Sequence, residues 1–209
     1  MRNVTDRTSN PFDMRPPCER FVPGYGDANA DFHVVGDHPG VHGGSETGVP
    51  FTGTPPAERL QRALHDAELL HEPGDEPVVG PTFLSYLHMC VPDDPLTEDD
   101  YAALEPFFDA ELRAIAAHVL LPVGARATRH VIEAYTARVR DTPVEMDRLH
   151  GTEVRGSGWL VVPVKDPAEW TGDDHDRLVT ALDELRRTDY RRVSDLGRFL
   201  PGGDPYLVR

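Results

Sequence analysis

The 209-residue sequence has little lysine, little cysteine and no long apolar run. No stretch approaches the roughly 20 apolar residues that a membrane-spanning helix needs, so we expect no membrane partner. The first residues, MRNVTDRTSNPFDMRPP, lack the apolar core of a secretion signal, which favours a cytoplasmic protein. The two cysteines, Cys18 and Cys90, are far apart in the sequence, which favours free thiols over a disulfide framework.

Lysine is nearly absent: Lys165 is the only one, and arginine supplies every other basic residue. The 36 acidic residues outnumber the 21 basic ones and give a formal net charge of -15. A dispersed acidic surface of this kind is typical of a protein that stays soluble in concentrated salt, where screening weakens self-repulsion. We therefore expect an extreme halophile, whose surface charge reflects the solvent and does not exclude a nucleic-acid ligand.

Apolar strands alternate with amphipathic helices along the chain. Strands are predicted over residues 31–36, 80–90, 118–124 and 158–164. Helices are predicted over 56–70, from Thr97 to about 117, over 125–139 and over 174–188. This alternation, with short and nearly all-apolar strands, predicts an α/β fold: three α/β/α layers around a mostly parallel four-stranded central sheet.

The length and the pattern indicate one main domain. We place it at residues 30–190, after an extended N-terminal segment at 1–29 and before an irregular C-terminal tail at 191–209. Ligands of such sheets bind beyond the carboxyl ends of the strands. The segments that directly follow the predicted strands are 37–40, 90–92, 124–125 and 165–167. We expect these four segments to converge into one site.

The segment GYGDANADFHVVGDHPG, followed by GVPFTGTPPAERL, resembles the first motif of the uracil-DNA glycosylase superfamily, in its family 4 form. The matching positions are Gly24, Gly26, Ala30, Asp31, Gly36, Pro39, Gly40, Gly48, Pro50, Phe51, Gly53 and Leu60. Three later segments, FLSYLHMCVPDDPLTEDDYAAL, VLLPVGARATRHVI and WLVVPVKDPAEW, are similar to the family's later motifs and follow in the same order. The resemblance covers about residues 18–185.

This resemblance implies a glycosylase that flips a base out of single- or double-stranded DNA and hydrolyses its N-glycosidic bond. It also implies substrate contacts in the first motif. Gly36, Pro39 and Gly40 form the turn that positions the attacking water, and Phe51 is the platform on which the flipped base stacks. His42 lies in the same loop and is a further candidate contact. We expect DNA as the partner and a monomeric protein.

The chain departs from family 4 in the turn itself. Asp37 and His38 stand where that family has glutamate and alanine. Asp37 could orient the attacking water, or His38 could act as the base with Asp37 as its partner. The alternative for His38 is that it only caps the loop by a hydrogen bond.

Two further departures concern the contacts to the base. Asp166, preceded by Lys165, stands where the family has the histidine of H-P-S, and an ionised Asp166 would oppose the departure of an anionic base. Lys165 could supply the positive charge instead, or both side chains could simply cap the next turn. Tyr86 stands where the family places an asparagine that reads uracil, and a phenol cannot reproduce an amide's paired donor and acceptor. The alternative is that Tyr86 packs in the core.

Family 4 members bind an iron–sulfur cluster through four cysteines. Cys90 matches one of those positions and Cys18 approximates another, while Leu104 stands at the last one. We therefore expect no cluster, no metal and no other cofactor.

The expected DNA contacts are the loop at 40–48 and the arginines Arg126 and Arg129 at a helix start.

These residues leave two main functional hypotheses. The first is a glycosylase with a rebuilt pocket, in which the catalytic candidates are Asp37, His38, Lys165 and Asp166. The second is a catalytically lapsed member of the same fold that binds a nucleic acid or a nucleotide. A third, an unrelated doubly wound domain with a chance match, also stays open.

Overall fold

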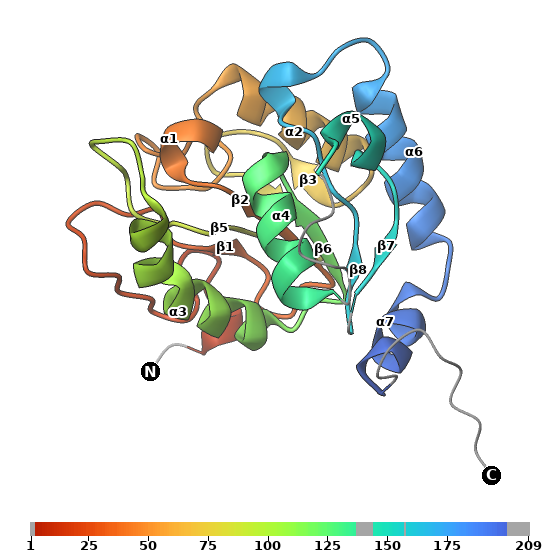
Figure 1. Cartoon of the computed structure of the whole chain (residues 1–209), viewed down its shortest axis with the longest axis horizontal. Helices are drawn as coiled ribbons and strands as arrows, with labels where there is room; N and C mark the ends of the chain where they lie inside the picture. Colours follow the sequence, from red (N-terminus) through yellow and green to blue (C-terminus); the bar gives the residue numbers. More distant parts are fainter. Residues whose placement is uncertain (1–2, 137–143, 157, 200–209) are drawn as a thin grey trace.

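The computed structural model describes residues 3–136, 144–156 and 158–199 (Figure 1). Its centre is a six-stranded sheet with the order β1-β5-β2-β6-β8-β7. The strands of this sheet are β1 (Tyr25–Gly26), β2 (Phe32–Gly36), β5 (Thr82–Tyr86), β6 (Val119–Pro122), β7 (Val154–Arg155) and β8 (Leu160–Val161). A separate two-stranded sheet joins β3 (Leu70–Glu72) to β4 (Val78–Val79).

The four central strands, β5, β2, β6 and β8, run parallel, as the sequence predicts. The edge strands β1 and β7 pair antiparallel with β5 and β8 and raise the strand number from the expected four to six. Each edge strand has two residues, which is too short to leave an alternating pattern in the sequence.

The helices are α1 (Pro39–His42), α2 (Pro55–Asp66), α3 (Glu98–Ile115), α4 (Gly124–Tyr135), α5 (Met146–Leu149), α6 (Asp174–Arg186) and α7 (Tyr190–Phe199). Two single turns of 3-10 helix are η1 (Val4–Asp6) and η2 (Pro167–Glu169). The predicted helix at 125–139 corresponds to α4, and its last three residues lie outside the described part of the chain. Among the described helices, none is long and apolar enough to cross a membrane.

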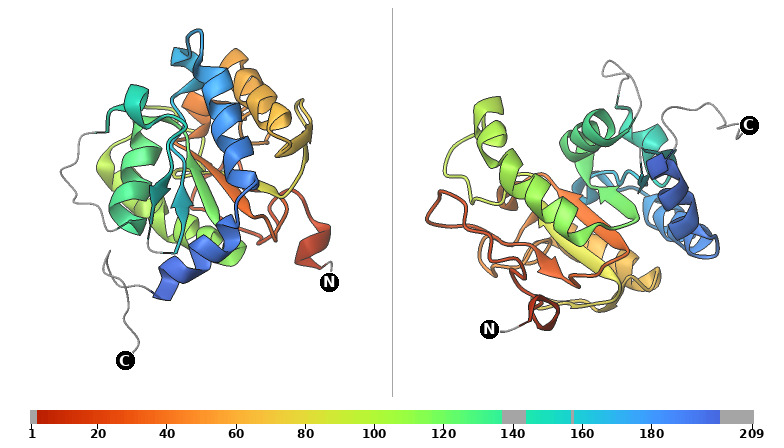
Figure 2. Two further views of the ribbon diagram at one scale, coloured as in Figure 1. Left: turned by 90° about the vertical axis from the view of Figure 1, so that its right-hand side faces the viewer. Right: turned by 90° about the horizontal axis from the view of Figure 1, so that it is seen from below.

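Helices cover both faces of the sheet (Figure 2). Successive residues of a strand point to opposite faces, so Val34 packs in the cluster that includes α2 and α6, while Val35 packs with α3 and α4. Leu121 and Leu120 of β6 divide in the same way. The three α/β/α layers expected from the sequence are therefore confirmed.

The prediction of an irregular C-terminal tail at residues 191–209 is wrong for its first part. Residues 190–199 form the helix α7 and not an irregular tail, whereas residues 200–209 lie outside the described part. Arg191 donates two hydrogen bonds to the carboxylate of Asp31, and Tyr190 donates a third. Asp31 is nearly buried at the start of β2, so these contacts fix the beginning of α7 to the sheet.

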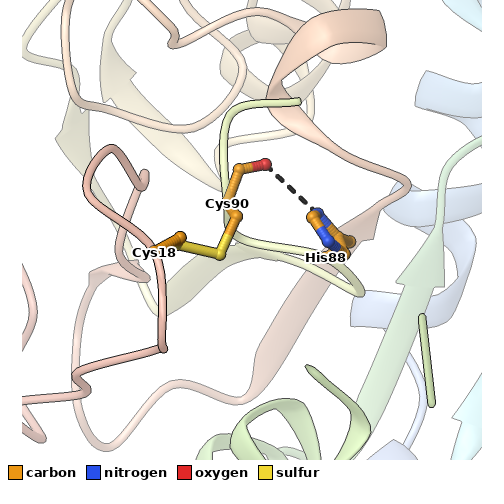
Figure 3. The surroundings of a disulfide bond; sticks show 3 residues. All are labelled: Cys18, His88 and Cys90. Atoms are coloured by element: carbon orange, nitrogen blue, oxygen red, sulfur yellow. Dashed lines mark hydrogen bonds between the residues drawn. A yellow bond between two sulfur atoms is a disulfide. The ribbon is translucent and has the colours of Figure 1, made fainter. Parts of the chain in front are cut away.

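The expectation of free thiols is wrong, because Cys18 and Cys90 form a disulfide (Figure 3). The N-terminal segment runs antiparallel to the chain that follows β5, and the backbone N–H of Val22 donates to the carbonyl of Met89 over 2.8 Å. This pairing brings the two cysteines together. A four-thiolate cluster does not fit these residues, since the chain has two cysteines and they are bonded to each other.

Candidate functional site

The four segments that follow the parallel strands do converge. His42 Nε2 lies 3.9 Å from Asp166 Oδ2, which joins the end of β2 to the end of β8. A Cβ atom added to Gly124 would lie 3.6 Å from the same His42 nitrogen, so the start of α4 also faces it. A Cβ atom added to Gly40 would lie 3.2 Å from Pro92 Cγ, which brings in the segment after β5. The four predicted segments therefore form a single site at this end of the sheet.

The turn after β2 continues into the four-residue helix α1. His38 is its N-cap: the backbone N–H of Gly40 donates to His38 Nδ1 over 3.1 Å. Pro39 occupies the first helical position, where its missing N–H costs nothing. Burial lowers the pKa of His38, and the charge of Asp37 opposes that shift. His38 therefore has the capping role, and it holds α1 so that His42 faces the end of the sheet.

Gly36 makes room for the rings beside the turn. A Cβ atom at this position would lie 2.7 Å from the ring of Tyr86 and 2.8 Å from His42 Nδ1. Both distances are shorter than real contacts allow, so a larger residue would displace one of these rings. The close packing of the Tyr86 and His42 rings therefore explains why the first motif has a glycine at position 36.

His42 is the buried histidine of the site. The backbone N–H of Asp37 donates to His42 Nδ1 over 3.0 Å, so the proton of the neutral ring is on Nε2. Burial lowers the pKa of His42, and the charges of Asp166 and Asp37 oppose that shift. The side chain is 3% exposed, and Nε2 has no hydrogen-bond partner among the described residues. A buried N–H without an acceptor costs about 1–3 kcal/mol, which indicates a place for a ligand acceptor.

Asp37 is held from the other side of the site. The hydroxyl of Tyr101 donates to Asp37 Oδ1 over 2.5 Å, and Oδ2 accepts no hydrogen bond from the described residues. Burial, followed by this hydrogen bond, raises the pKa of Tyr101. Arg126 lies over the Tyr101 ring, 4.2 Å from its centre, and forms an ion pair with Glu98 over 2.9 Å. The expected DNA contact Arg126 thus takes part in internal contacts at the rim of the site.

Tyr101 is a site residue that the sequence analysis missed. It lies in the first turn of α3, which begins with a capping box between Thr97 and Asp100. The sequence predicts that capping box, and a helix that follows a parallel strand begins at the carboxyl edge of the sheet. These two signals together could have placed Tyr101 near Asp37.

Phe51 and Tyr86 pack beneath His42. The Phe51 backbone N–H donates to the Tyr86 hydroxyl over 2.7 Å, and that hydroxyl donates to the carbonyl of Gly43 over 2.8 Å. Burial raises the pKa of Tyr86. The rings of Phe51 and His42 are stacked with centres 5.7 Å apart, and Phe51 is 1% exposed. Tyr86 is therefore a core residue, which is the alternative that the sequence left open. His42 covers one face of the Phe51 ring.

Lys165 points away from this group. Its Nζ lies 2.7 Å from Asp147 Oδ1 and 3.4 Å from Asp174 Oδ2, and the hydrogen bond to Asp147 raises its pKa. Asp166 caps η2 by accepting the backbone N–H of Ala168 over 2.8 Å at Oδ1, while its Oδ2 faces His42. Of the two residues, Asp166 alone reaches the centre of the site.

Among the described residues, no group of three or more histidine, cysteine, aspartate or glutamate side chains could hold a metal ion. The protein groups that the site offers are a carboxylate of Asp37 with one oxygen unengaged, and a neutral N–H of His42 beside the carboxylate of Asp166.

The family model of the uracil DNA glycosylase superfamily matches residues 23–186. The chain belongs to this superfamily. The match includes β2, the turn that carries Asp37, and the segment of Asp166, and it ends before α7.

The individual relatives are named as uracil-DNA glycosylases of two types, type 4 and type 5. A type-5 uracil-DNA glycosylase of Pyrobaculum aerophilum is 29% identical over 188 residues, which cover 85% of this chain and 77% of that protein. A type-5 enzyme of Thermus thermophilus is 36% identical over 85 residues, 39% of each chain. A type-4 enzyme of Saccharolobus solfataricus is 25% identical over 150 residues, 70% of this chain and 65% of that protein. The chain is thus similar to type-5 enzymes as well as to the expected family 4 form.

Proposed function

We propose that the protein is a DNA glycosylase, which hydrolyses the N-glycosidic bond of a damaged base flipped out of DNA. Membership of the superfamily supports this proposal, as do relatives named as type-4 and type-5 uracil-DNA glycosylases. The observation that carries it is the buried N–H of His42, which lacks a partner among the described residues and faces the strand ends beside Asp37.

In this proposal Asp37 positions the attacking water and accepts its proton. The oxygen that Tyr101 leaves unengaged accepts a hydrogen bond from the water that attacks the C1′ atom of the sugar. The new bond joins the water oxygen to C1′, and the C1′–N bond breaks with its electron pair going to the base. The water proton goes to the Asp37 carboxylate. As the C1′–N bond breaks, the Nε2–H of neutral His42 donates a hydrogen bond to an oxygen of the departing base and stabilises its negative charge, while the proton stays on His42.

The same pair of residues suggests which bases fit. His42 offers a donor and Asp166 an acceptor, and the two atoms are 3.9 Å apart. In this proposal the hydrogen bond from His42 outweighs the repulsion between Asp166 and the departing anion. A base edge with a carbonyl next to an N–H presents the complementary acceptor and donor. Uracil, hypoxanthine and xanthine carry such an edge, so they are the substrates to test.

The decisive experiment is a base-release assay in molar potassium chloride, with each of those three bases in single- and double-stranded DNA. Asp37→Asn and His42→Gln are expected to reduce release by about 100-fold or more, the scale of losing a group that acts in the transition state. His71→Gln is the matched control, because His71 is an exposed histidine on β3. Equal release by His42→Gln and His71→Gln would contradict the assigned role.

One observation favours the second candidate function, a nucleic-acid-binding protein without catalysis. Phe51 is 1% exposed and His42 lies against its ring, so the expected stacking platform is covered. DNA binding by the wild-type protein with no release of any of the three bases is the result that would support this candidate.

We also propose that the protein works in concentrated salt. The formal net charge of -15 and the near absence of lysine support this proposal.

A further inference from the structure

A hollow of about 500 Å³ lies beside the candidate site, between α2 and the chain that leads into α6. Its lining residues are Arg59, Arg62, Asp66, Trp170, Thr171 and His175. We propose that this hollow, the arginine hollow, binds the phosphodiester backbone of the DNA strand next to the flipped nucleotide. The inference rests on the proposed function in one respect, that the ligand is DNA.

The arginine hollow adjoins the candidate site directly. Arg59 donates a hydrogen bond to the carbonyl of Pro167 over 2.7 Å. Pro167 follows Asp166, whose carboxylate lies 3.9 Å from His42 Nε2. In Figure 1, α2 and the segment that leads into α6 lie at the same end of the sheet as α1. A strand with one nucleotide at His42 would therefore place a neighbouring phosphate at the hollow.

Two guanidinium groups of the hollow have no acidic partner among the residues that the structure describes. Arg59 and Arg62 are three residues apart on α2, so they lie side by side on one face of that helix. Arg59 bonds to a backbone carbonyl, Arg62 Nε donates to the carbonyl of Glu58 over 3.2 Å, and no described carboxylate forms an ion pair with either. The chain has 36 acidic and 21 basic residues, so acidic partners are abundant. Two adjacent unneutralised arginines fit an external anion, and guanidinium groups bind phosphate in a bidentate manner.

The other walls of the hollow suit a nucleotide. Its one acidic lining residue, Asp66, already pairs with His175 over 3.0 Å and with His65 over 3.2 Å. The indole N–H of Trp170 donates to the carbonyl of Lys165 over 2.8 Å, which fixes the ring at the edge of the hollow. An aromatic wall next to arginines is the combination on which single-stranded nucleic acids bind, through phosphate contacts and base stacking.

The test measures the binding of a fluorescent oligothymidine of about 15 nucleotides, the length range of single-strand binding sites. Arg62→Gln is the main variant, because Arg62 is exposed and its one described hydrogen bond is within its own helix. Arg187→Gln is the matched control: Arg187 is also exposed and lies at the far end of α6 from His175. We expect Arg62→Gln to weaken binding about fivefold and to reduce the salt slope by about 0.7, and Arg187→Gln to change neither.

The possible results separate the arginine hollow from the glycosylase proposal. Equal binding by Arg62→Gln and Arg187→Gln overturns the hollow, as does a wild-type protein that binds no oligonucleotide. Release of a damaged base at a limiting DNA concentration should fall in Arg62→Gln in proportion to its weaker binding, and should not fall in Arg187→Gln. If binding depends on Arg62 but no base is released, the hollow stands and the glycosylase proposal fails.

Inorganic phosphate provides the last arm of the test. If the hollow binds DNA backbone, phosphate should compete no better than chloride of equal ionic strength. Competition by phosphate at low concentration, lost in Arg62→Gln, would identify a free-phosphate site and overturn the assignment to DNA.

Discussion

At the scale of single residues, the orientation of Asp37 depends on a hydroxyl from a residue 64 positions away, Tyr101. We predict that Tyr101→Phe lowers the rate of base release about tenfold, because a hydrogen bond to a charged group contributes roughly 1.5–3 kcal/mol. Tyr135→Phe is the matched control, since the Tyr135 hydroxyl also donates to an aspartate, Asp109, outside the site. Single-turnover kinetics at saturating DNA measure the effect. A rate for Tyr101→Phe equal to that of Tyr135→Phe would show that the hydroxyl does not position Asp37.

The sequence predicts which segments form the site better than it predicts what each side chain does. Asp37, His42 and Asp166 follow parallel strands, so the topology alone brings them together. Lys165 is adjacent to Asp166 but points the other way, because successive side chains of an extended segment face opposite sides. Tyr86 lies on a strand, where the sequence does not reveal whether its ring faces the pocket or the core.

A second prediction at this scale concerns Glu111, a fully buried residue of α3 that forms no ion pair among the described residues. Burial raises its pKa from the usual 4.5 to about 8, and the neighbouring Ser85 opposes that shift. Between these two values the folded protein keeps a proton that the unfolded chain releases. The free energy of unfolding therefore falls as the pH rises through this window.

We predict that Glu111→Gln removes this fall. In urea unfolding at pH 5, 7 and 9, the free energy of unfolding of the variant should rise relative to that of the wild type as the pH increases. The difference should reach about 2 kcal/mol or more at pH 9. Glu105→Gln, at an exposed position of the same helix, should follow the wild type. Parallel pH profiles for the wild type and Glu111→Gln would refute the prediction.

At the scale of elements, the disulfide attaches the N-terminal segment to the chain after β5. Cys18 and Cys90 are 72 residues apart, and closing a loop of this length lowers the entropy of the unfolded chain, which stabilises the folded state by a few kcal/mol. We predict that a reducing agent lowers the free energy of unfolding by about 2–4 kcal/mol. The double variant Cys18→Ser/Cys90→Ser should have the lower stability without reductant and should not respond to it. A reductant effect that persists in the double variant would point to a different cause.

The elements that the sequence predicts are those with a local signal. The capping box of Thr97 and Asp100 marks the start of α3, and the apolar runs mark the four central strands. The elements that it misses depend on distant partners. Strand β1 exists because Tyr25 pairs with Leu84, and α7 is fixed where Arg191 bonds to Asp31, 160 residues earlier. No window of neighbouring residues contains that information.

At the scale of the whole molecule, charge and fold are separate properties. The core that covers the two faces of the sheet is apolar, whereas the excess of 36 acidic over 21 basic residues has to be accommodated mainly at the surface. At low ionic strength this excess opposes the compact state, since like charges repel over the Debye length. The same excess repels DNA, so arginines without acidic partners, as in the arginine hollow, are the natural points of attachment.

The charge leads to a prediction for the molecule as a whole. Raising potassium chloride from 0.1 M to 1 M shortens the Debye length from about 10 Å to about 3 Å, so it should remove most of the self-repulsion and raise the unfolding temperature by roughly 10 °C. Asp93 and Asp94 are exposed, lie before the start of α3, and no described basic side chain forms an ion pair with them. Replacing both by asparagine should raise the unfolding temperature in 0.1 M salt and reduce the response to salt. If the double variant instead unfolds at a lower temperature in 0.1 M salt and responds to salt as the wild type does, charge repulsion is not what salt relieves.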